Sequence, residues 1–280
     1  MNRMHGIAVP FGRACAVFLC AAFLCVAARA QGDDALARLR QKGEISIANT
    51  QASPPWSLLD ESNQPAGYDV DVAREIAKRI GVPKVTFVAD SFSNFVDGLR
   101  TAKYDIVVNS MAATAERKKI VDFSVPYAPQ EFRIWVNDKT SGINQVADLA
   151  GRKVGVEAGT SNEVWARAHL PNSTILSYDN GGFLYNDLGT GRIDAVIESH
   201  FAGLKEKEIN HLPIHEAGPV LTISLGCIAL PKNQPALENA INGAIADMSK
   251  DGTLERLGHK WLGSNYDVVG DIQKVTQKTN

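Results

Sequence analysis

Apolar positions recur with helical spacing in some segments of the chain, and short apolar runs lie between these segments. Between 73 and 80 the apolar residues stand at i, i+3, i+4 and i+7, which predicts one face of a helix that Gly81 ends. The flanking runs are short and rich in β-branched residues, as in buried strands. In this first part the pattern predicts strands at 45–48, 85–88 and 105–108, and helices at 73–80 and 92–101.

The same alternation restarts near Asn144. Strands that alternate with helices indicate a mainly parallel α/β sheet, and two such runs indicate two lobes. Apolar stretches near 132–135 and 222–225 are where we expect the chain to cross between the lobes. The second run predicts helices at 146–149, after 159–161 and at 182–188, and strands at 153–156, 175–178 and 194–197; helices at 236–248 and up to Trp261 follow.

The first thirty residues have the pattern of a secretory leader. Arg3 and Arg13 precede an unbroken apolar run at 14–28, and Ala28-Arg29-Ala30 supplies the small-x-small pattern of a cleavage site. The run is shorter than the roughly 20 residues that span a bilayer. We therefore expect residues 1–30 to be a signal peptide, cleaved near Ala30-Gln31, and the mature protein to be exported.

Composition and charge exclude several other classes of protein. The chain has 280 residues with 45% hydrophobic and 21% charged residues, an ordinary globular composition. Loss of the leader removes three arginines and no acid, which leaves 26 basic against 31 acidic residues and a net charge of −5. Nucleic acid is not an expected partner of such a chain. Three of the four cysteines also leave with the leader, so Cys227 remains as a single, buried, inert thiol, and no Cys/His cluster indicates a metal.

A candidate anion site follows the predicted strand at 105–108. Thr114 is placed to cap a helix that begins with Ala115-Glu116-Arg117, at the edge where α/β sheets bind ligands. A helix start offers free N–H groups, and Arg117 adds a planar fork that matches a carboxylate. The alternative is a surface ion pair of Arg117 with Glu116 or Asp122. A cation in a first helical turn opposes the helix dipole, which favours an external anion.

Short motifs follow one another in a characteristic order between 43 and 263. They include Gly67-Tyr68-Asp69-Val70-Asp71-Val72, Thr114-Ala115-Glu116-Arg117, Val121-Asp122-Phe123-Ser124, Asp148-Leu149-Ala150-Gly151 and Lys260-Trp261-Leu262-Gly263. In this order they resemble the family 3 periplasmic solute-binding proteins, the polar amino acid receptors of ABC importers. The resemblance implies a two-lobed periplasmic binding protein fold, each lobe a mainly parallel sheet flanked by helices, with two crossover strands as hinge. We place lobe 1 at 31–131 plus 226–263, lobe 2 at 135–222, and a loose polar tail at 264–280.

The resemblance also implies a set of ligand-binding residues. In the family, an arginine at the position of Arg117 grips the α-carboxylate of the ligand, and backbone amides of Thr160 and Ser161 close on it from the second lobe. A plain helix cap is the alternative for Thr160. The acids Asp69 and Asp71, at a helix start, are interpreted as caps and dipole partners. The other candidate ligand-binding residues are Ser110, Ala112, Phe92, Trp56, Glu198 and Ser199.

The sequence departs from the family pattern where the ligand's ammonium group is held. The usual aspartate after the strand at 194–197 is replaced by Ser199, and the carboxylate, Glu198, stands one residue early. Since successive strand residues point to opposite sides, Glu198 need not reach the place of that aspartate. Ala112 and Ser53 also replace a family serine and a family aromatic residue. Glu157 and Glu198 together either favour a basic ligand or are solvated charges at strand ends.

These observations predict a monomeric periplasmic binding protein that captures a small carboxylate, foremost an amino acid, and delivers it to an ABC permease in the inner membrane. Two alternatives remain open. The ligand is a non-standard amino acid derivative or another small organic acid, or the chain is a dehydratase-type enzyme in which Glu198, His200 and Asp179 supply acid and base. No nucleophile–base pair or cofactor loop has useful spacing, so we expect no catalytic residue and no cofactor.

Overall fold

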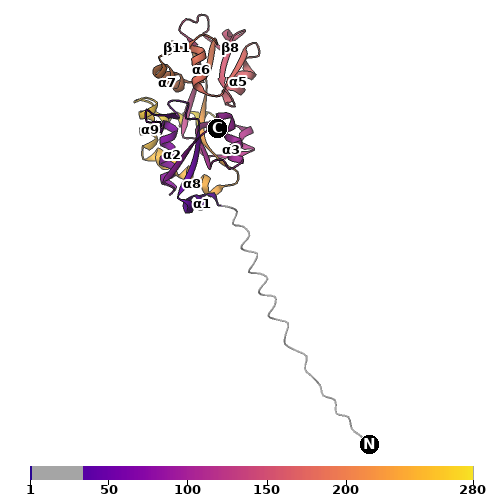
Figure 1. Ribbon diagram of the computed structural model, residues 1–280, viewed down its shortest axis with the longest axis vertical. Coiled ribbons are helices and arrows are strands. Elements are labelled where there is room, and N and C mark those ends of the chain that lie inside the picture. The colour runs from indigo at the N-terminus through magenta and orange to yellow at the C-terminus, as the bar shows by residue number, and fades with distance from the viewer. Residues whose placement is uncertain (2–33, 280) are drawn as a thin grey trace. The chain divides into compact units, whose positions relative to one another are not determined.

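The computed structural model describes residues 1 and 34–279, and the predicted leader lies almost entirely outside them. Residues 35–279 form one compact unit around a single nine-stranded sheet with the strand order β4-β1-β5-β11-β7-β10-β8-β9, in which β6 pairs with β11. Helices surround both ends of this sheet (Figure 1). Within the described residues no helix combines the length and apolar character needed to cross a membrane.

One end of the sheet belongs to the segment predicted as lobe 1. Its strands β4, β1 and β5 are parallel to one another. We call this end, with its helices, the first lobe. Its elements are α1 (Ala35–Lys42), β1 (Glu44–Asn49), β2 (Leu58–Leu59), β3 (Pro65–Ala66), α2 (Tyr68–Arg79), β4 (Lys84–Ala89), the 3₁₀ helix η1 (Phe92–Asn94), α3 (Phe95–Arg100), β5 (Ile106–Ala112), α4 (Ala115–Lys118), β6 (Val121–Phe123), α8 (Pro235–Lys250) and α9 (Thr253–Trp261).

The other end, which we call the second lobe, repeats the design. Its strands β10, β8 and β9 are again parallel. Its helices α5, α6 and α7 gather around this end in Figure 1, while α2, α3 and α8 lie around the first lobe. The elements are η2 (Val146–Leu149), β8 (Lys153–Glu157), α5 (Ser161–His169), β9 (Thr174–Tyr178), α6 (Gly181–Gly189), β10 (Ala195–Ser199) and α7 (His200–Asn210).

Two long antiparallel strands join the lobes. They are β7 (Ala128–Asn137) and β11 (Ile214–Pro231), and they lie side by side in the middle of the sheet. Both contain the apolar stretches predicted as crossovers. Their register shifts between Ala217 and Thr222, so the pairing is interrupted once along β11. The predicted two-lobed α/β fold is therefore confirmed, whereas the residue boundaries assigned to the lobes stay a prediction.

Each lobe has its own buried core, as the spacing of apolar residues requires. In the first lobe the inward face of α2, with Ile76 and Ala77 fully buried, packs on strands β1 and β5. In the second lobe Val154 and Val156 of β8 pack with Ile197 of β10. Alternate strand residues therefore fill the two cores, and the residues at the ends of the strands lie outside these cores.

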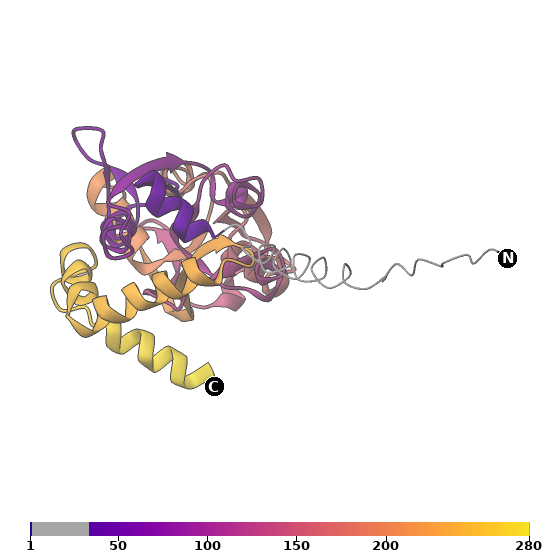
Figure 2. The ribbon, with the colours of Figure 1, turned by 90° about the horizontal axis from the view of Figure 1, so that it is seen from below.

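The C-terminal segment differs from the loose polar tail expected at 264–280. It forms the helix α10 (Val268–Thr279), the last helix of the chain in Figure 2. Val268 is fully buried, and Val269 and Ile272 pack against the core of the first lobe. These three residues stand at i, i+1 and i+4 and form one apolar face of the helix. The segment was predicted as a loose tail because most of its other residues are polar.

Asp69 and Asp71, interpreted as caps and dipole partners, lie in the first turn of α2, but neither of them is its cap. The N-cap of α2 is Gly67, and it makes no side-chain capping bond. Asp69 is fully buried and accepts hydrogen bonds from Ser110 and Tyr127, while Asp71 accepts from Lys260 and Trp261 of α9. Both acids lie in the first turn of α2, but their side chains tie this helix to other elements.

Candidate functional site

A cavity lies between the two lobes, at the carboxyl ends of their parallel strands. It is lined by residues of both lobes and of the crossover strands. Seven of the nine predicted site residues line it, whereas Arg117 and Ser199 do not. The lining residues are Ser53, Pro54, Trp56, Phe92, Asn109, Ser110, Ala112, Gln130, Phe132, Glu157, Thr160, Ser161, Asn162, Gly181, Tyr185, Glu198, Ala202, Glu206 and Ser224.

Arg117 lies at the edge of this cavity and bridges the lobes. Its guanidinium donates to the carbonyl of Ala112 (2.8 Å) in the first lobe and to the carbonyl of Gly159 (2.8 Å) in the second. It also stacks 5.2 Å above the ring of Phe92. No carboxylate of the described residues forms an ion pair with it, so the predicted alternative of a surface pair with Glu116 or Asp122 does not occur. Burial lowers the pKa of Arg117 to about 10, which leaves it charged at neutral pH.

The position of Arg117 follows from the local sequence. Thr114 caps α4 as predicted, because its hydroxyl accepts from the backbone N–H of Arg117. The helix has only one turn, so the side chain of Arg117 leaves it directly after strand β5 ends at Ala112. The cation is thereby fixed next to a strand end.

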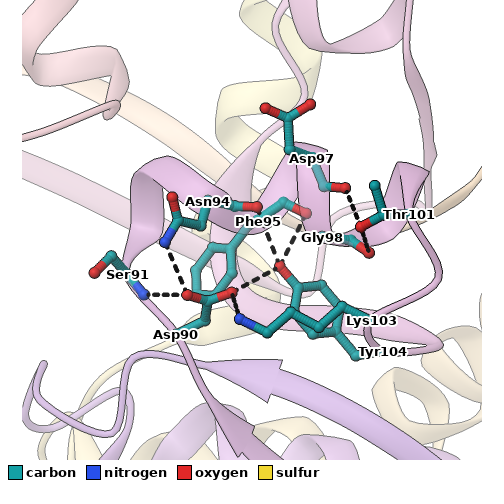
Figure 3. A network of polar contacts seen from close by, with 9 residues as sticks. All are labelled: Asp90, Ser91, Asn94, Phe95, Asp97, Gly98, Thr101, Lys103 and Tyr104. Atoms are coloured by element: carbon teal, nitrogen blue, oxygen red, sulfur yellow. Dashed lines mark hydrogen bonds and ion pairs between the residues drawn. The ribbon is translucent and has the colours of Figure 1, made fainter.

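Phe92 forms a wall of the cavity, and the residues on either side of it in the chain, Ser91 and Asn94, belong to a polar network around Asp90 (Figure 3). Asp90 accepts from the Ser91 backbone, from Asn94 and from Lys103, which ties the two ends of the segment together. Tyr104 donates to the carbonyls of Asn94 and Phe95. The ring of Phe92 thus stands on a rigid turn.

Trp56 forms a second wall and is almost fully buried. Its indole ring meets Tyr68 edge-on at 5.8 Å and Phe201 at 6.0 Å between ring centres. Phe201 belongs to α7 of the second lobe, so Trp56 makes a contact between the lobes. Trp56 thus lies in the cavity lining where the second lobe covers it, and its role toward a ligand, wall or lid, stays a prediction.

Thr160 and Ser161 begin helix α5 at the second-lobe edge of the cavity. The Thr160 hydroxyl donates to the Glu157 carbonyl (2.7 Å) and accepts from the Glu163 amide (3.2 Å), so it is the N-cap of the helix. Its side chain is therefore used within the helix start, as the cap alternative expected. Of the first-turn N–H groups of α5, those of Ser161 and Asn162 have no acceptor inside the helix and are available to an anion.

Ser110 lines the cavity, but its side chain is bound from behind. Its hydroxyl donates to Asp69 (2.9 Å), and its backbone N–H donates to the hydroxyl of Tyr127 (2.7 Å), which also donates to Asp69 (2.7 Å). Burial raises the pKa of Asp69 to about 7, against the lowering effect of these two hydroxyl donors. This network supports the floor of the cavity beneath Ser110.

Two carboxylates of the second lobe enter the cavity together, at the ends of neighbouring strands. Glu157 ends β8, and Glu198 is the penultimate residue of β10. One oxygen of each, Glu157 Oε1 and Glu198 Oε2, is buried without a hydrogen-bond partner. Burial and the nearby Glu198 raise the pKa of Glu157 well above its usual range, and burial raises the pKa of Glu198 to about 7.

Ser199 lies outside the cavity, as the alternation of β10 requires. It is 1% exposed, and its hydroxyl has no hydrogen-bond partner among the described residues. Its backbone N–H donates to Oε1 of Glu198 (2.7 Å). The carboxylate that stands one residue earlier than the family aspartate therefore does reach the cavity, from the other side of the strand.

Sequence reasoning missed several lining residues, of which Tyr185 and Glu206 carry polar groups deep in the site. Glu206 lies on α7, a helix that the sequence analysis did not predict. Its carboxylate accepts a hydrogen bond from the side-chain amide of Asn210 (2.7 Å). Burial raises the pKa of Glu206. A signal existed, because Ala202 and Glu206 stand at i and i+4 on the inward face of this helix.

The chain belongs to the bacterial extracellular solute-binding proteins of family 3. The family's sequence pattern matches residues 45–264. The L-cystine-binding protein TcyJ of Escherichia coli strain K12 is 31% identical over 231 residues, which cover 82% of this chain and 86% of that protein. Relatives of this family are substrate-binding proteins, in agreement with a cavity between two lobes.

Solved structures show the same fold. A mutant of ArgBP from T. maritima superimposes with a TM-score of 0.77 at 28% identity and covers 81% of this chain and 99% of its own. The ancestral amino acid-binding protein AncCDT-1, a precursor of cyclohexadienyl dehydratase, has a TM-score of 0.76 at 31% identity, with 81% and 98% coverage. The second of these structures is thus described as the precursor of an enzyme.

The described residues contain no cluster of three or more His, Cys, Asp or Glu side chains suited to a metal ion. Cys227 is buried, and burial raises the pKa of its thiol to about 12. The cavity offers aromatic walls, helix amides and carboxylates, and Arg117 lies beside it. This set can hold a charged organic solute by ion pairs and hydrogen bonds.

Proposed function

We propose that this protein captures an amino acid in the cavity between its lobes and presents it to an ABC permease, as the exported binding component of an importer. The observation that carries the proposal is Arg117, a half-buried guanidinium without an acidic partner that contacts both lobes beside the cavity. A ligand carboxylate is the anion that would complete it, with the first-turn amides of α5 as second donors.

Closure of the lobes is part of this proposal. Arg117 and Trp56 each contact the second lobe, so the described arrangement is a closed one. A ligand would bind the first lobe first and then be enclosed as β7 and β11 flex, a domain closure of the hinge type. The predicted lobes, 31–131 with 226–263 and 135–222, are the bodies that move, and the predicted leader would deliver the chain to the periplasm.

We further propose that the protein binds its ligand without turning it over. His200, one of the residues considered for an enzyme, pairs with Glu216 and does not line the cavity. Asp179 does not line it either. Of the three residues considered for an enzyme, only Glu198 lines the cavity, and its place next to Glu157 suits the binding of a cation.

Calorimetric titration with a panel of amino acids tests the proposal. We expect micromolar or tighter binding of at least one member, and Arg117→Ala should weaken it at least about 100-fold, since it leaves a buried carboxylate unpaired. Lys118→Ala, an exposed neighbour on the same helix, is the control and should change affinity less than twofold. Unchanged affinity in Arg117→Ala would refute the proposed carboxylate site.

A further inference from the structure

Within the described residues, the cavity is lined by several acidic side chains and by no basic one. Three of its lining residues are carboxylic acids, namely Glu157, Glu198 and Glu206, and no lining residue is a lysine, arginine or histidine. All three acids belong to the second lobe. Arg117, beside the cavity, supplies a single positive charge that the proposed function assigns to the ligand's carboxylate.

Two of these acids are immediate neighbours on the sheet. Strands β8 and β10 are parallel, with Val196 paired to Gly155. Two residues further along each strand, the same register places Glu198 beside Glu157 on one side of the sheet. Both side chains point to the cavity, and each leaves one buried oxygen without a donor. Two adjacent carboxylates in this state repel each other unless a proton or a cation lies between them.

Neighbouring elements offer little compensation. Asn162 of α5 donates to Glu198, and the buried Tyr185 hydroxyl of α6 has no partner. Arg133, which opposes Glu198 on β7, pairs with Glu131 and lies 3.8 Å from Glu216; its buried Nε has no partner among the residues described, and it forms no ion pair with Glu198.

The remaining groups near the pair are also engaged or acidic. His200 of α7 pairs with Glu216, and Glu206 accepts only from Asn210. The part of the chain that the structure describes thus provides no basic side chain that pairs with Glu157 or Glu198.

We propose that the site selects an amino acid with a second cationic group, an amine or a guanidinium on its side chain, and that Glu157 and Glu198 bind the ligand's positive charges as a pair. This inference rests on the proposed function. A zwitterionic amino acid brings one carboxylate for Arg117 and one ammonium, and so leaves one carboxylate of the pair without a counter-charge. A ligand with two cations and one carboxylate satisfies all three charges.

Proton release accompanies this binding. In the ligand-free protein the pair retains a proton on one carboxyl group, because two buried carboxylates side by side do not both ionise near neutral pH. When the cationic ligand enters, the O–H bond of that carboxyl breaks, its proton passes to solvent, and the ligand's N–H groups donate to the freed oxygen. Affinity should therefore fall as the solution is made acidic below neutrality.

Matched pairs of probes test the inference on the wild-type protein. L-Arginine and L-citrulline have the same length, but only arginine is charged at its end; L-lysine and L-norleucine, which lacks only the terminal ammonium, form a second charged and neutral pair. We expect arginine or lysine to bind at least about 100-fold more tightly than its neutral partner. Titration in phosphate and in Tris should show different apparent enthalpies, which measures the released proton. Equal affinity within both pairs overturns the inference, and so does the absence of binding by both cationic probes.

Variants assign the effect to the pair. Glu157→Gln and Glu198→Gln should each lower the ratio of cationic to neutral affinity at least tenfold and should abolish the buffer dependence of the enthalpy. Glu208→Gln, an exposed acid on α7, is the matched control and should change neither. A thermal melt of each ligand-free variant checks that it is folded. An unchanged ratio in both folded pair variants overturns the inference.

The same panel distinguishes this inference from the proposed function. If neutral or acidic amino acids bind best and Arg117→Ala still abolishes their binding, the proposed function stands and the cationic class is wrong. If Arg117→Ala binds every probe as the wild type does, the carboxylate site itself fails. L-Cystine, which carries two ammonium groups but also two carboxylates, belongs in the panel, and tighter binding of cystine than of arginine and lysine overturns the proposed class, a ligand with two cations and one carboxylate.

Discussion

Two buried acidic sites of this protein differ in what surrounds them. In the first lobe Asp69 is fully buried, and the hydroxyls of Ser110 and Tyr127 donate to its Oδ1, while its Oδ2 is buried without a partner in the described part of the chain. In the second lobe Glu157 and Glu198 lie next to each other. The backbone N–H of Ser199 donates to Oε1 of Glu198, but Oε2 of Glu198 and Oε1 of Glu157 are buried without a donor from the described residues. The first site connects α2 with β5 and with Tyr127, the residue before β7, whereas the second faces the cavity.

The difference teaches how a buried carboxyl group can be interpreted. A raised pKa alone does not separate the two sites, because burial raises the pKa of Asp69 and of Glu198 to about 7 alike. What separates them is geometry: protein hydroxyls occupy the space in front of Asp69, while the cavity occupies the space in front of Glu198. Buried polar groups normally have partners, so unpartnered ones beside a cavity indicate a ligand.

The largest expected effect concerns the pH dependence of stability without ligand. The folded state of wild type holds a proton on Glu198 up to about pH 7, while the unfolded chain loses it near 4.5. Wild-type stability should therefore fall between these pH values, by at most about 3 kcal/mol relative to Glu198→Gln. Urea unfolding of both proteins at pH 5 and pH 8 measures the difference, in which the titration of Asp69 cancels. If the free energy of unfolding of the two proteins changes equally with pH, the pKa of Glu198 is not raised in the folded state.

A smaller effect is expected at the first-lobe site. Asp69→Ala removes the acceptor of two buried hydroxyls, Ser110 and Tyr127, which should cost about 2 kcal/mol in the free energy of unfolding. The ratio of arginine to citrulline affinity should stay within twofold of wild type. Asp97→Ala, an exposed acid, should change stability by less than about 0.5 kcal/mol. A shifted affinity ratio in Asp69→Ala would contradict the division between a structural and a ligand-binding acid.

The smallest effect is expected for Ser199, which replaces the family's aspartate. Its hydroxyl is buried, lies outside the cavity and has no partner, so Ser199→Ala should change stability by less than about 0.5 kcal/mol and affinity less than twofold. Calorimetric titration and urea unfolding check both values. A loss of affinity comparable to that of Glu198→Gln would mean that the serine, and not the preceding glutamate, meets the ligand.

Much of the fold could be predicted because local signals and burial agree. The alternation of short apolar runs with helical spacing gave the strands and helices of both lobes, and the cap at Thr114 was predicted from residue type alone. The helix α10 was missed because its apolar residues are few and their face is recognisable only against the first-lobe core. Tertiary packing, and not local preference, stabilises such a helix.

The candidate site was predicted less completely, for a geometric reason. Residues near a motif, such as Arg117 and Thr160, can be named from the chain. The role of Asp69 could not, since its partners Ser110 and Tyr127 are 41 and 58 residues away. The neighbourhood of Glu157 and Glu198 depends likewise on the register of β8 and β10, which no local pattern specifies.

The buried thiol of Cys227 has a consequence for experiments on this protein. It is 5% exposed, and burial raises its pKa to about 12, so thiol reagents such as maleimides find almost no reactive thiolate there. A cysteine introduced at an exposed position, for instance Asn265→Cys, would therefore be labelled selectively with the native cysteine in place. Pairs of fluorophores attached in this way would let opening and shutting of single molecules be followed in real time.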